Sequence, residues 1–382
     1  RASMARCDLV LTTGGLGPTD DDRTCEAVAR AAGVERVRDE AVLAELRERF
    51  QRAGYPFTAN NEQQALFPAG AEVLPNERGT AAGFVVRAGA CLVASMPGVP
   101  SEMKHMFDAH LSPLLQRELA ASPATVRVLR TFGVGESQID DRLRGLLDDA
   151  HGRPEVTLHF RTSFPENAVI LVCRGDDPEH HAALLDALEA GVRERLGPDV
   201  VFGTDETSFA GAVVAALRDS GATVALAESC TGGLAGDLLT SAPGSSDVFE
   251  LGVVAYANRI KQQVLGVPVE VLEGPGAVSR ECVEAMARGV RELAGATYGV
   301  AVSGIAGPGG GTPDKPVGTV HFALARADGV RHLERRFPFD RRRNKLLAAH
   351  VALALPMRHA LGALPEGHDP LAGRWSPAGG RR

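Results

Sequence analysis

The sequence of 382 residues is long enough for two to three domains at about 150 residues each, which excludes a small scaffold held together by disulfides. With 44% hydrophobic and 23% charged residues, it has the composition of a folded globular protein rather than of a disordered or fibrous one. A formal net charge of −7 disfavours nucleic acid as the main partner, because phosphate backbones are held by positive fields.

The six cysteines are scattered without a CxxC pair, so we expect neither a disulfide framework nor a structural zinc site, and a cytoplasmic location. No apolar run approaches the ~18 residues of a membrane span, so we expect no membrane partner. Only four of the 41 basic residues are lysines, namely Lys104, Lys261, Lys315 and Lys345. Because arginine is the default cation here, a retained lysine hints at a need for an amine that can lose its proton.

The first segment, residues 1–123, alternates strand and helix patterns. A strand over residues 7–13 runs into Gly14-Gly15-Leu16-Gly17-Pro18, and a helix is predicted over residues 20–32, with acids in its first turn. Further predicted elements are a helix over 40–53, strands over 83–87 and 90–95, and a helix over 100–119. We predict an α/β domain of three layers, and we expect its start to lie outside the given sequence.

The second segment, residues 124–203, predicts a compact α+β unit. Its expected elements are strands over 126–132, 155–161 and 168–174 and helices over 137–147 and 178–196. The loop over 133–137 has the composition of a glycine turn before a capped helix, although a ligand contact stays open.

The third segment, residues 204–364, predicts an α/β domain. Helices are expected over 208–220, 231–240, 259–265 and 279–294, the third capped by Asn258, and strands over 223–227, 251–257, 298–303, 319–327 and 332–338. A final helix from about residue 341 should be kinked or shortened by Pro356, and residues 365–382 are expected to be disordered.

Ser229 lies where a buried strand meets a glycine-rich turn, in Ala227-Glu228-Ser229-Cys230-Thr231-Gly232-Gly233. Free N–H groups at such a helix start suit a bound phosphate or a developing oxyanion, while a plain N-cap is the alternative. The next strand leads to Lys261, and neighbouring parallel strands end at one edge of a sheet. We therefore expect the amine to reach Ser229 and act as its base, as in Ser-Lys variants of hydrolytic triads.

A third strand delivers Ser303 and a glycine run to the same edge. The run can approach a phosphate or sugar closely, and a plain surface loop is about equally compatible with it. Cys230 is a rival nucleophile, but a packed structural cysteine is the commoner case, and no nearby histidine would activate it.

These residues resemble the CinA family (competence/damage-inducible protein A). Residues 227–233, Tyr256, Asn258, Lys261 and residues 303–310 are similar to its C-terminal domain, a nicotinamide mononucleotide deamidase of the PncC type. Residues 12–24 and 97–103 look like its N-terminal domain of the molybdopterin-binding (MoaB/MogA) type, and the middle segment resembles its KH-like domain. The resemblance covers nearly all of residues 7–363.

The resemblance implies hydrolysis of the carboxamide of nicotinamide mononucleotide, without a cofactor. It implies Ser229, Lys261 and Tyr256 as catalytic residues. Substrate binding would fall to Thr231, Gly232, Gly233, Asn258, Ser303, Gly304, Gly307, Gly309, Gly310 and Arg341. It also implies a cytoplasmic homodimer.

In the N-terminal domain the resemblance implies a nucleotide site and metal-dependent ADP-ribose pyrophosphatase activity. Its expected residues are Gly14, Gly15, Gly17, Thr19, Asp21, Asp22, Gly98 and Glu102. The glycines can cradle a phosphate, and Asp22 is the expected ligand of Mg²⁺ or another divalent ion, although acids that complement a helix dipole are an open alternative. The competing function is a non-catalytic nucleotide- or pterin-binding module that acts through protein partners in competence or the response to DNA damage.

Overall fold

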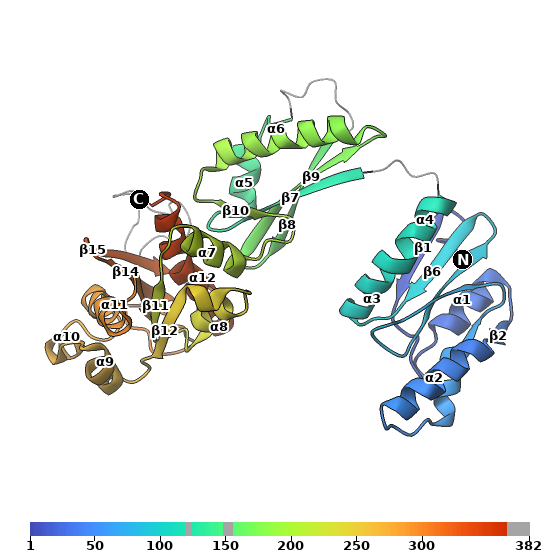
Figure 1. Cartoon of the computed structure of the whole chain (residues 1–382), viewed down its shortest axis with the longest axis horizontal. Helices are drawn as coiled ribbons and strands as arrows, with labels where there is room; N and C mark the ends of the chain where they lie inside the picture. The colour runs from blue at the N-terminus through green and yellow to red at the C-terminus, as the bar shows by residue number, and fades with distance from the viewer. Residues whose placement is uncertain (120–123, 148–155, 365–382) are drawn as a thin grey trace. The chain divides into compact units, whose positions relative to one another are not determined.

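The computed structural model describes residues 1–119, 124–147 and 156–364 (Figure 1). The chain divides into two compact units, Arg1–Ser122 and Pro123–Arg382, which are described separately below. The expectation for residues 365–382 lies outside the described residues.

The first unit is built on a four-stranded sheet with helices on both faces. The strands stand in the order β1 (Leu9–Thr13), β6 (Cys91–Met96), β5 (Gly83–Ala88) and β4 (Glu72–Leu74), with β1 parallel to β6 and the other pairs antiparallel. Side chains alternate between the faces, so that Val85 packs in one core with Met106 while Phe84 packs in another with Val28. The expected three-layer α/β domain is confirmed.

The helices of this unit differ from the prediction at two places. They are α1 (Thr24–Ala32), α2 (Glu40–Arg52), η1 (Ala59–Ala65), α3 (Pro100–Met106), the π-helical turn η2 (Phe107–Leu111) and α4 (Ser112–Glu118), beside a small ribbon of β2 (Arg36–Arg38) and β3 (Leu66–Pro68). The prediction of one regular helix over 100–119 was wrong, because Pro113 has no N–H for an intrahelical bond. The acids at 20–22 lie before α1 rather than in its first turn.

The second unit begins with a four-stranded antiparallel sheet covered on one face by two helices. Its elements are β7 (Ala124–Thr131), α5 (Glu136–Leu143), β8 (Val156–Ser163), β9 (Glu166–Arg174), α6 (Pro178–Leu196) and β10 (Val201–Thr204), and the strand order is β10-β7-β9-β8. Leu129 and Leu171 of the sheet pack against Ile139 and Leu185 of the helices. This is the expected α+β arrangement, with β10 as a strand that the sequence pattern missed.

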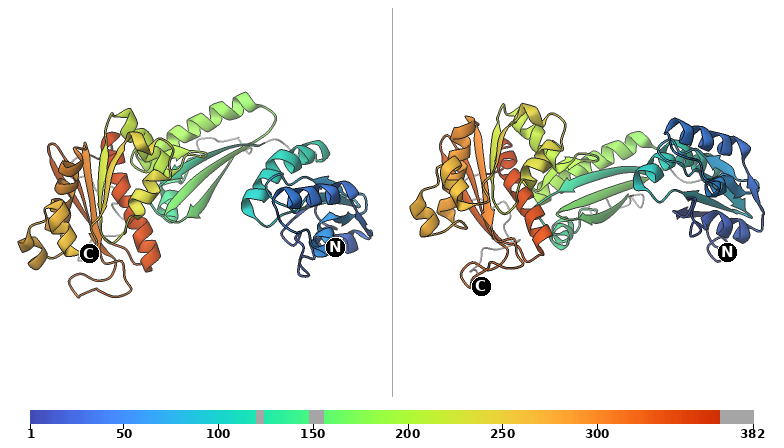
Figure 2. Two further views of the ribbon diagram at one scale, coloured as in Figure 1. Left: turned by 60° about the horizontal axis from the view of Figure 1, so that its bottom comes forward. Right: turned by 90° about the horizontal axis from the view of Figure 1, so that it is seen from below.

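A five-stranded sheet between two helical layers forms the rest of the second unit. Its elements are α7 (Phe209–Asp219), β11 (Val224–Glu228), α8 (Leu234–Thr240), η4 (Ser245–Asp247), β12 (Phe249–Val254), α9 (Asn258–Leu265), α10 (Val269–Glu273), α11 (Arg280–Ala294), β13 (Tyr298–Gly304), β14 (Thr319–Arg326), β15 (Gly329–Arg336) and α12 (Arg341–Ala360). In the strand order β12-β11-β13-β14-β15, β11 is parallel to both neighbours. Helix α11 covers one face, and α12 with α7 and α8 covers the other (Figures 1 and 2).

Three local predictions for this domain were wrong. Helix α8 begins at Leu234 rather than at residue 231, because Gly232 and Gly233 adopt left-handed backbone angles, with φ of 63° and 96°. Asn258 is the first helical residue of α9 instead of its cap. Helix α12 continues past Pro356 to Ala360, so of the two expected effects of the proline, a kink or a shortened helix, the shortening was wrong.

Helix α12 is apolar on most of its surface because it packs on two sides. Its Arg358 is 1% exposed, donates to the carbonyl oxygens of Asp199 and Phe132 at 2.9 and 3.2 Å, and lies over the Phe132 ring. The ring of His350 in the same helix lies 5.6 Å from the ring of Phe132, measured between centroids. The helix whose first turn carries Arg341 is therefore fixed to the middle α+β part by a buried cation and aromatic contacts.

Candidate active site

Ser229 follows directly on β11 and is held in line with the sheet, since its N–H donates to the carbonyl of Val302 in β13 at 3.0 Å. The two parallel neighbours of β11 bring the ends of three strands to one edge, as the sequence predicted. Ser229 is not the N-cap of α8, because Gly233 occupies that position. The N-cap alternative for Ser229 was therefore wrong, and its hydroxyl is available for another role.

Lys261 of α9 reaches this serine from the next strand connection. Its Nζ lies 3.2 Å from the Oγ of Ser229 and 2.7 Å from the carbonyl oxygen of Ala255. The lysine is 1% exposed, and burial lowers its pKa, because a protonated amine is disfavoured away from water. A nucleophile and an amine that can be neutral thus lie within hydrogen-bonding distance.

Cys230 is unsuited to the role of nucleophile. It is 6% exposed, and burial raises the pKa of its thiol to about 12. Since the thiolate is the reactive form, a thiol with such a pKa stays protonated at neutral pH. Cys282, also buried in this domain, has a thiol pKa raised to about 11 by burial.

The backbone N–H groups after Ser229 are largely occupied. Gly232 donates to the carbonyl of Ser229 at 3.1 Å, and Gly233 donates to the carboxylate of Glu228 at 2.9 Å. The N–H groups of Gly232 and Gly233, at the expected helix start, are therefore not free to stabilise a developing oxyanion. In the described parts of the chain, the N–H groups of Cys230 and Thr231 have no hydrogen bond to an acceptor of another residue, and these two remain as candidates.

Tyr256 and Arg341 lie together at the open side of this edge. Tyr256 is 62% exposed, and its hydroxyl accepts a hydrogen bond from Arg341 at 3.2 Å. Arg341 also donates to the carbonyl oxygen of Gly307 at 2.7 Å, which ties the start of α12 to the glycine run. Among the described residues, the Tyr256 hydroxyl has no hydrogen bond to Lys261, whose Nζ instead lies 3.4 Å from the backbone carbonyl oxygen of Tyr256.

A basic pocket of about 560 Å³ opens beside the Ser229 turn. Its lining residues are Leu234 of α8 and Arg341, Arg342, Lys345 and Leu346 of α12. A Cβ atom built on Gly232 would lie only 3.6 Å from the Nζ of Lys345, so this lysine contacts the turn. The sequence prediction did not include Lys345 among the substrate-binding residues, although it is one of only four lysines in the sequence.

Several of the expected substrate-binding residues have structural contacts instead. Ser303 is 1% exposed and donates to the carbonyl oxygen of Ala277 at 2.7 Å. A Cβ on Gly304 would lie 2.7 Å from the backbone oxygen of Thr319, so this glycine permits close strand pairing. Thr231 is fully buried, and its hydroxyl has no partner among the described residues. These three residues therefore lie below the surface of the site and belong to its framework.

Of the remaining expected residues, Gly307 is buried, and a Cβ on it would lie 2.7 Å from the side chain of Val317, whereas Gly309 and Gly310 are exposed. Gly307 and Gly310 take left-handed angles, with φ of 90° and 86°, and a Cβ on Gly309 would meet open space. Asn258 is exposed at the start of α9. The glycine run is therefore an open loop that a ligand can approach.

In the first unit, the two loops that carry the family resemblance, within residues 12–24 and 97–103, lie side by side. A Cβ on Gly98 would lie 3.3 Å from the Cα of Gly14, and Gly14 and Gly15 both have positive φ angles. Thr24 donates its hydroxyl to the carbonyl of Gly14 at 2.7 Å. The glycines expected to bind nucleotide are thus brought together after β1.

Asp22 is bound within its own loop. Its Oδ2 accepts from the backbone N–H and the hydroxyl of Thr19 at 3.0 and 2.7 Å, and these bonds lower its pKa, with the hydroxyl as the main cause. The same hydroxyl lies 2.5 Å from Oδ1 of Asp21, yet it has only one hydrogen to donate. Two carboxylates around one hydroxyl form a set of hard oxygen donors that fits a divalent cation.

The other acid of this prediction is placed differently. Glu102 accepts from the side-chain amide of Asn76 at 2.7 Å and lies beneath Gly79. Among the described residues, no group of three or more His, Cys, Asp or Glu side chains is arranged to hold a metal ion. A cation at Asp21 and Asp22 would therefore need further oxygens from a phosphate-bearing substrate.

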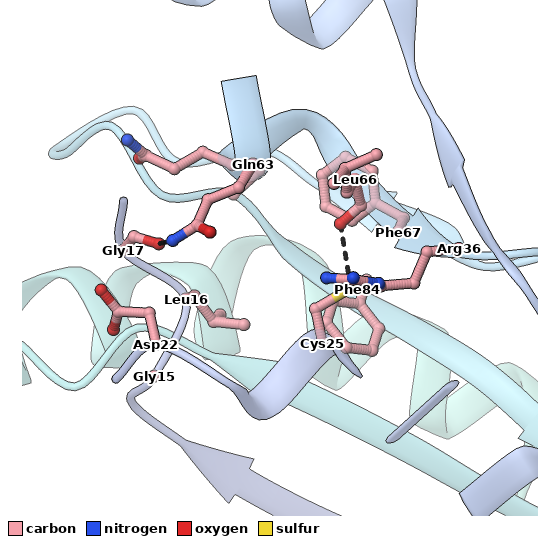
Figure 3. A pocket seen from close by; sticks show the side chains of 12 residues that line it. Gly15, Leu16, Gly17, Asp22, Cys25, Arg36, Gln63, Leu66, Phe67 and Phe84 are labelled. Carbon is pink, nitrogen blue, oxygen red and sulfur yellow. Dashed lines mark hydrogen bonds between the residues drawn. The ribbon is translucent and has the colours of Figure 1, made fainter. Parts of the chain in front are cut away.

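The cavity below the glycine loop is small. It measures about 20 Å³ and is lined by Gly15, Gly17, Asp22, Cys25 and Gln63 among others (Figure 3). The side-chain amide of Gln63 donates to the carbonyl oxygen of Gly17 at 2.9 Å, which closes the loop over this space. A volume of this size holds about one water molecule, so a nucleotide would have to bind over the loop.

Comparison with known proteins adds an independent finding. Residues 1–117 match the model of the probable molybdopterin binding domain, residues 126–203 the damage-inducible protein CinA KH domain, and residues 206–360 the CinA C-terminal domain. A CinA-like protein of Anaeromyxobacter sp. (strain Fw109-5) is 46% identical over 355 residues, which cover 93% of this chain and 85% of the relative. The chain belongs to the CinA family.

The chain is also similar to other relatives and, over part of its length, to solved structures. A CinA-like protein of Myxococcus xanthus is 40% identical and covers 95% of this chain and 86% of its own length. The competence/damage inducible protein CihA from Agrobacterium tumefaciens is 42% identical over 40% of this CinA-family chain and 93% of its own, with a TM-score of 0.38. A CinA superfamily protein from Escherichia coli is 31% identical over 40% and 88%, also with a TM-score of 0.38. No helix in the described parts of the chain is long and apolar enough to cross a membrane.

Proposed function

We propose that the C-terminal domain is an amidohydrolase that converts nicotinamide mononucleotide and water to nicotinate mononucleotide and ammonia. The observation that supports this most is the buried amine of Lys261, 3.2 Å from the Oγ of Ser229. A serine attacks an amide carbon only when a base removes its proton, and a lysine held neutral by burial is such a base.

In the proposed mechanism, Oγ of Ser229 forms a bond to the carboxamide carbon while Lys261 takes its proton. The oxyanion that develops is stabilised by the N–H groups of Cys230 and Thr231. Lys261 then gives the proton to the departing nitrogen, which leaves as ammonia. Water, deprotonated by the same amine, attacks the acyl-serine and releases nicotinate mononucleotide with Ser229 restored. The rate should rise with pH through the lowered pKa of Lys261, since only the neutral amine accepts a proton.

We assign the substrate phosphate to the basic pocket of α12. Arg341, Arg342 and Lys345 line it, and Lys345 contacts Gly232 of the serine turn. Guanidinium groups bind phosphate with two parallel hydrogen bonds, and the ammonium adds a point charge. Tyr256, whose hydroxyl is bonded to Arg341, orients the nucleotide between this pocket and Ser229.

For the N-terminal domain we propose metal-dependent hydrolysis of the pyrophosphate of ADP-ribose. The support is the pair of carboxylates, Asp21 and Asp22, next to the glycines of the β1 loop. A nucleotide- or pterin-binding module without chemistry is the second candidate, favoured by the bonding of Asp22 within its own loop. Hydrolysis of ADP-ribose that requires added Mg²⁺ separates the two. Action in the cytoplasm as a homodimer is part of this proposal.

The deamidase proposal is tested by incubating the purified chain with nicotinamide mononucleotide and measuring ammonia and nicotinate mononucleotide. We expect stoichiometric formation of both, and none above background with Ser229→Ala. Binding of the substrate by Ser229→Ala, measured by calorimetry, shows that this variant keeps its site. Absence of ammonia from the wild-type chain, with substrate bound, would favour a binding module.

A further inference from the structure

We infer that Glu228 is a positioning residue that aligns Ser229 with Lys261 by closing the serine turn with its buried carboxylate. This inference rests on the proposed function of the Ser-Lys pair. Glu228 is the last residue of β11 and directly precedes the serine. It is only 3% exposed, which is unusual for a glutamate and calls for a specific set of partners.

The partners of Glu228 are three backbone N–H groups on the far side of the turn. One carboxylate oxygen accepts from Gly233 at 2.9 Å and Ala235 at 3.1 Å, and the other accepts from Gly236 at 2.8 Å. The carboxylate therefore joins the residue before Ser229 to the first turn of α8. Left-handed angles at Gly232 and Gly233 let the chain fold back tightly enough for these bonds.

The backbone of the same residue is connected to the amine. The carbonyl oxygen of Glu228 accepts from the N–H of Ala255 at 2.8 Å, and the carbonyl oxygen of Ala255 accepts from Nζ of Lys261 at 2.7 Å. One residue thus holds the serine turn through its side chain and the lysine contact through its main chain. A change in its position would alter the 3.2 Å separation of Ser229 and Lys261.

The test compares Glu228→Gln with Glu250→Gln, an exposed glutamate on the neighbouring strand β12. A glutamine has one acceptor oxygen and an NH₂ group, so it cannot accept all three bonds and would face a backbone donor with a donor. For Glu228→Gln we expect kcat for nicotinamide mononucleotide to fall about 10- to 100-fold with KM changed less than about threefold. Glu250→Gln should match the wild type in both.

A second measurement does not depend on turnover of this substrate. A fluorophosphonate probe labels activated serines, and intact-mass spectrometry gives the rate of its addition to Ser229. We expect the labelling rate of Glu228→Gln to fall as kcat does. If the wild-type chain is labelled but releases no ammonia, the deamidase proposal is wrong. The positioning role of Glu228 is then tested by comparing the labelling rates of the wild type and Glu228→Gln. A wild-type chain that is neither labelled nor active overturns both.

Glu228→Asp covers the case in which the glutamine variant does not fold. Because aspartate keeps the negative charge, this variant should fold and unfold cooperatively on heating. Because its side chain is one methylene shorter, Ser229 should be labelled several-fold more slowly than in the wild type. Labelling and kcat at wild-type values in either folded variant would overturn the inference.

Discussion

The molecule contains two turns of the same local type with different surroundings. After β1, which is partly exposed, and after the buried β11, the chain leads through glycines with positive φ angles into a helix, and in each turn a carboxylate accepts from the backbone. Asp22 is partly exposed and bonded within its own loop, whereas Glu228 is 3% exposed and ties the turn to the next helix. Only the second turn has a buried amine brought to it by a neighbouring element.

This difference shows that a strand, glycine turn and helix supply anion-binding geometry but no proton transfer. At β11 the proposed proton acceptor, Lys261, comes from α9, which lies beside the turn because β12 is parallel to β11. At β1 the groups around the glycine turn include the backbone of Gly98, the side-chain amide of Gln63 and the carboxylates of Asp21 and Asp22. The first turn is therefore suited to holding a cation and phosphates, and the second to nucleophilic attack.

The largest effect is expected from Lys261→Arg. Arginine keeps the charge but stays protonated at neutral pH, so it cannot accept the serine proton. We expect kcat for deamidation to fall about 10³-fold or more while the substrate still binds, and the double variant with Ser229→Ala to be little worse than either single one. Steady-state kinetics and calorimetry measure these quantities.

The control for this prediction is Lys104→Arg, at an exposed lysine of α3. It should leave deamidation unchanged. Near-normal turnover by Lys261→Arg would mean that the lysine acts only as a charge, and that the serine loses its proton to water.

A smaller and selective effect is expected from Asp22→Ala. If the two turns work separately, this variant should lower Mg²⁺-dependent hydrolysis of ADP-ribose about 10-fold or more and leave deamidation within twofold, since sites that share no residues act independently. Asp20→Ala, which removes a neighbouring exposed acid, should change neither activity. Parallel loss of both activities in Asp22→Ala would contradict the separation of the two sites.

The sequence predicted the layers and the central pair of the candidate site because these follow from strong patterns. Apolar strands that alternate with amphipathic helices determined the α/β domains, and parallel neighbours of β11 placed Ser229 and Lys261 at one edge. The family match to the CinA C-terminal domain agrees with that domain prediction.

What the sequence did not predict depends on contacts between distant residues. The use of the α8 N–H groups by Glu228 and the approach of Lys345 to Gly232 require the folded turn. Local backbone angles at Gly232 and Gly233 moved the start of α8 by three residues, and no periodic pattern reports such angles. Burial of Ser303 beneath the surface likewise came from packing against the chain before α11.

A moderate effect on stability is expected from Arg358→Met, which weakens the attachment of α12 to the middle α+β part. The carbonyl oxygens of Phe132 and Asp199 would lose a buried donor, which costs about 3 kcal/mol and lowers Tm by about 6 °C or more. Thermal unfolding measures this, with Arg218→Met, an exposed arginine of α7, as the control. An unchanged Tm would show that the contacts are not needed.

Residues 204–364 alone should deamidate the substrate, since every proposed catalytic residue lies within them. The fragment should melt at a lower temperature than residues 124–364, because α12 loses its second packing surface. A folded but inactive fragment would mean that the middle part contributes to the site. The second turn would then not be self-contained.

The smallest effect is expected in the pH dependence of stability near the second turn. His321, opposite Ser303 in the strand pairing, stacks on His332 with a ring nitrogen separation of 3.0 Å, and burial lowers its pKa to about 4. Charged groups from three elements face this pair, namely Glu334, Lys315, Arg280, Glu281 and Glu284. Since the unfolded chain binds a proton near pH 6.5 and the folded one near pH 4, the histidine contributes stability above about pH 6.5 that is lost as pH falls toward 4.

His321→Gln should flatten the fall of Tm between those pH values, measured by thermal unfolding in a pH series. Replacement of the exposed His159 by Gln should leave the slope unchanged. An equally steep fall in His321→Gln would place the acid sensitivity elsewhere, for example in the ion pairs of Glu77 with His105 and His110 in the first unit.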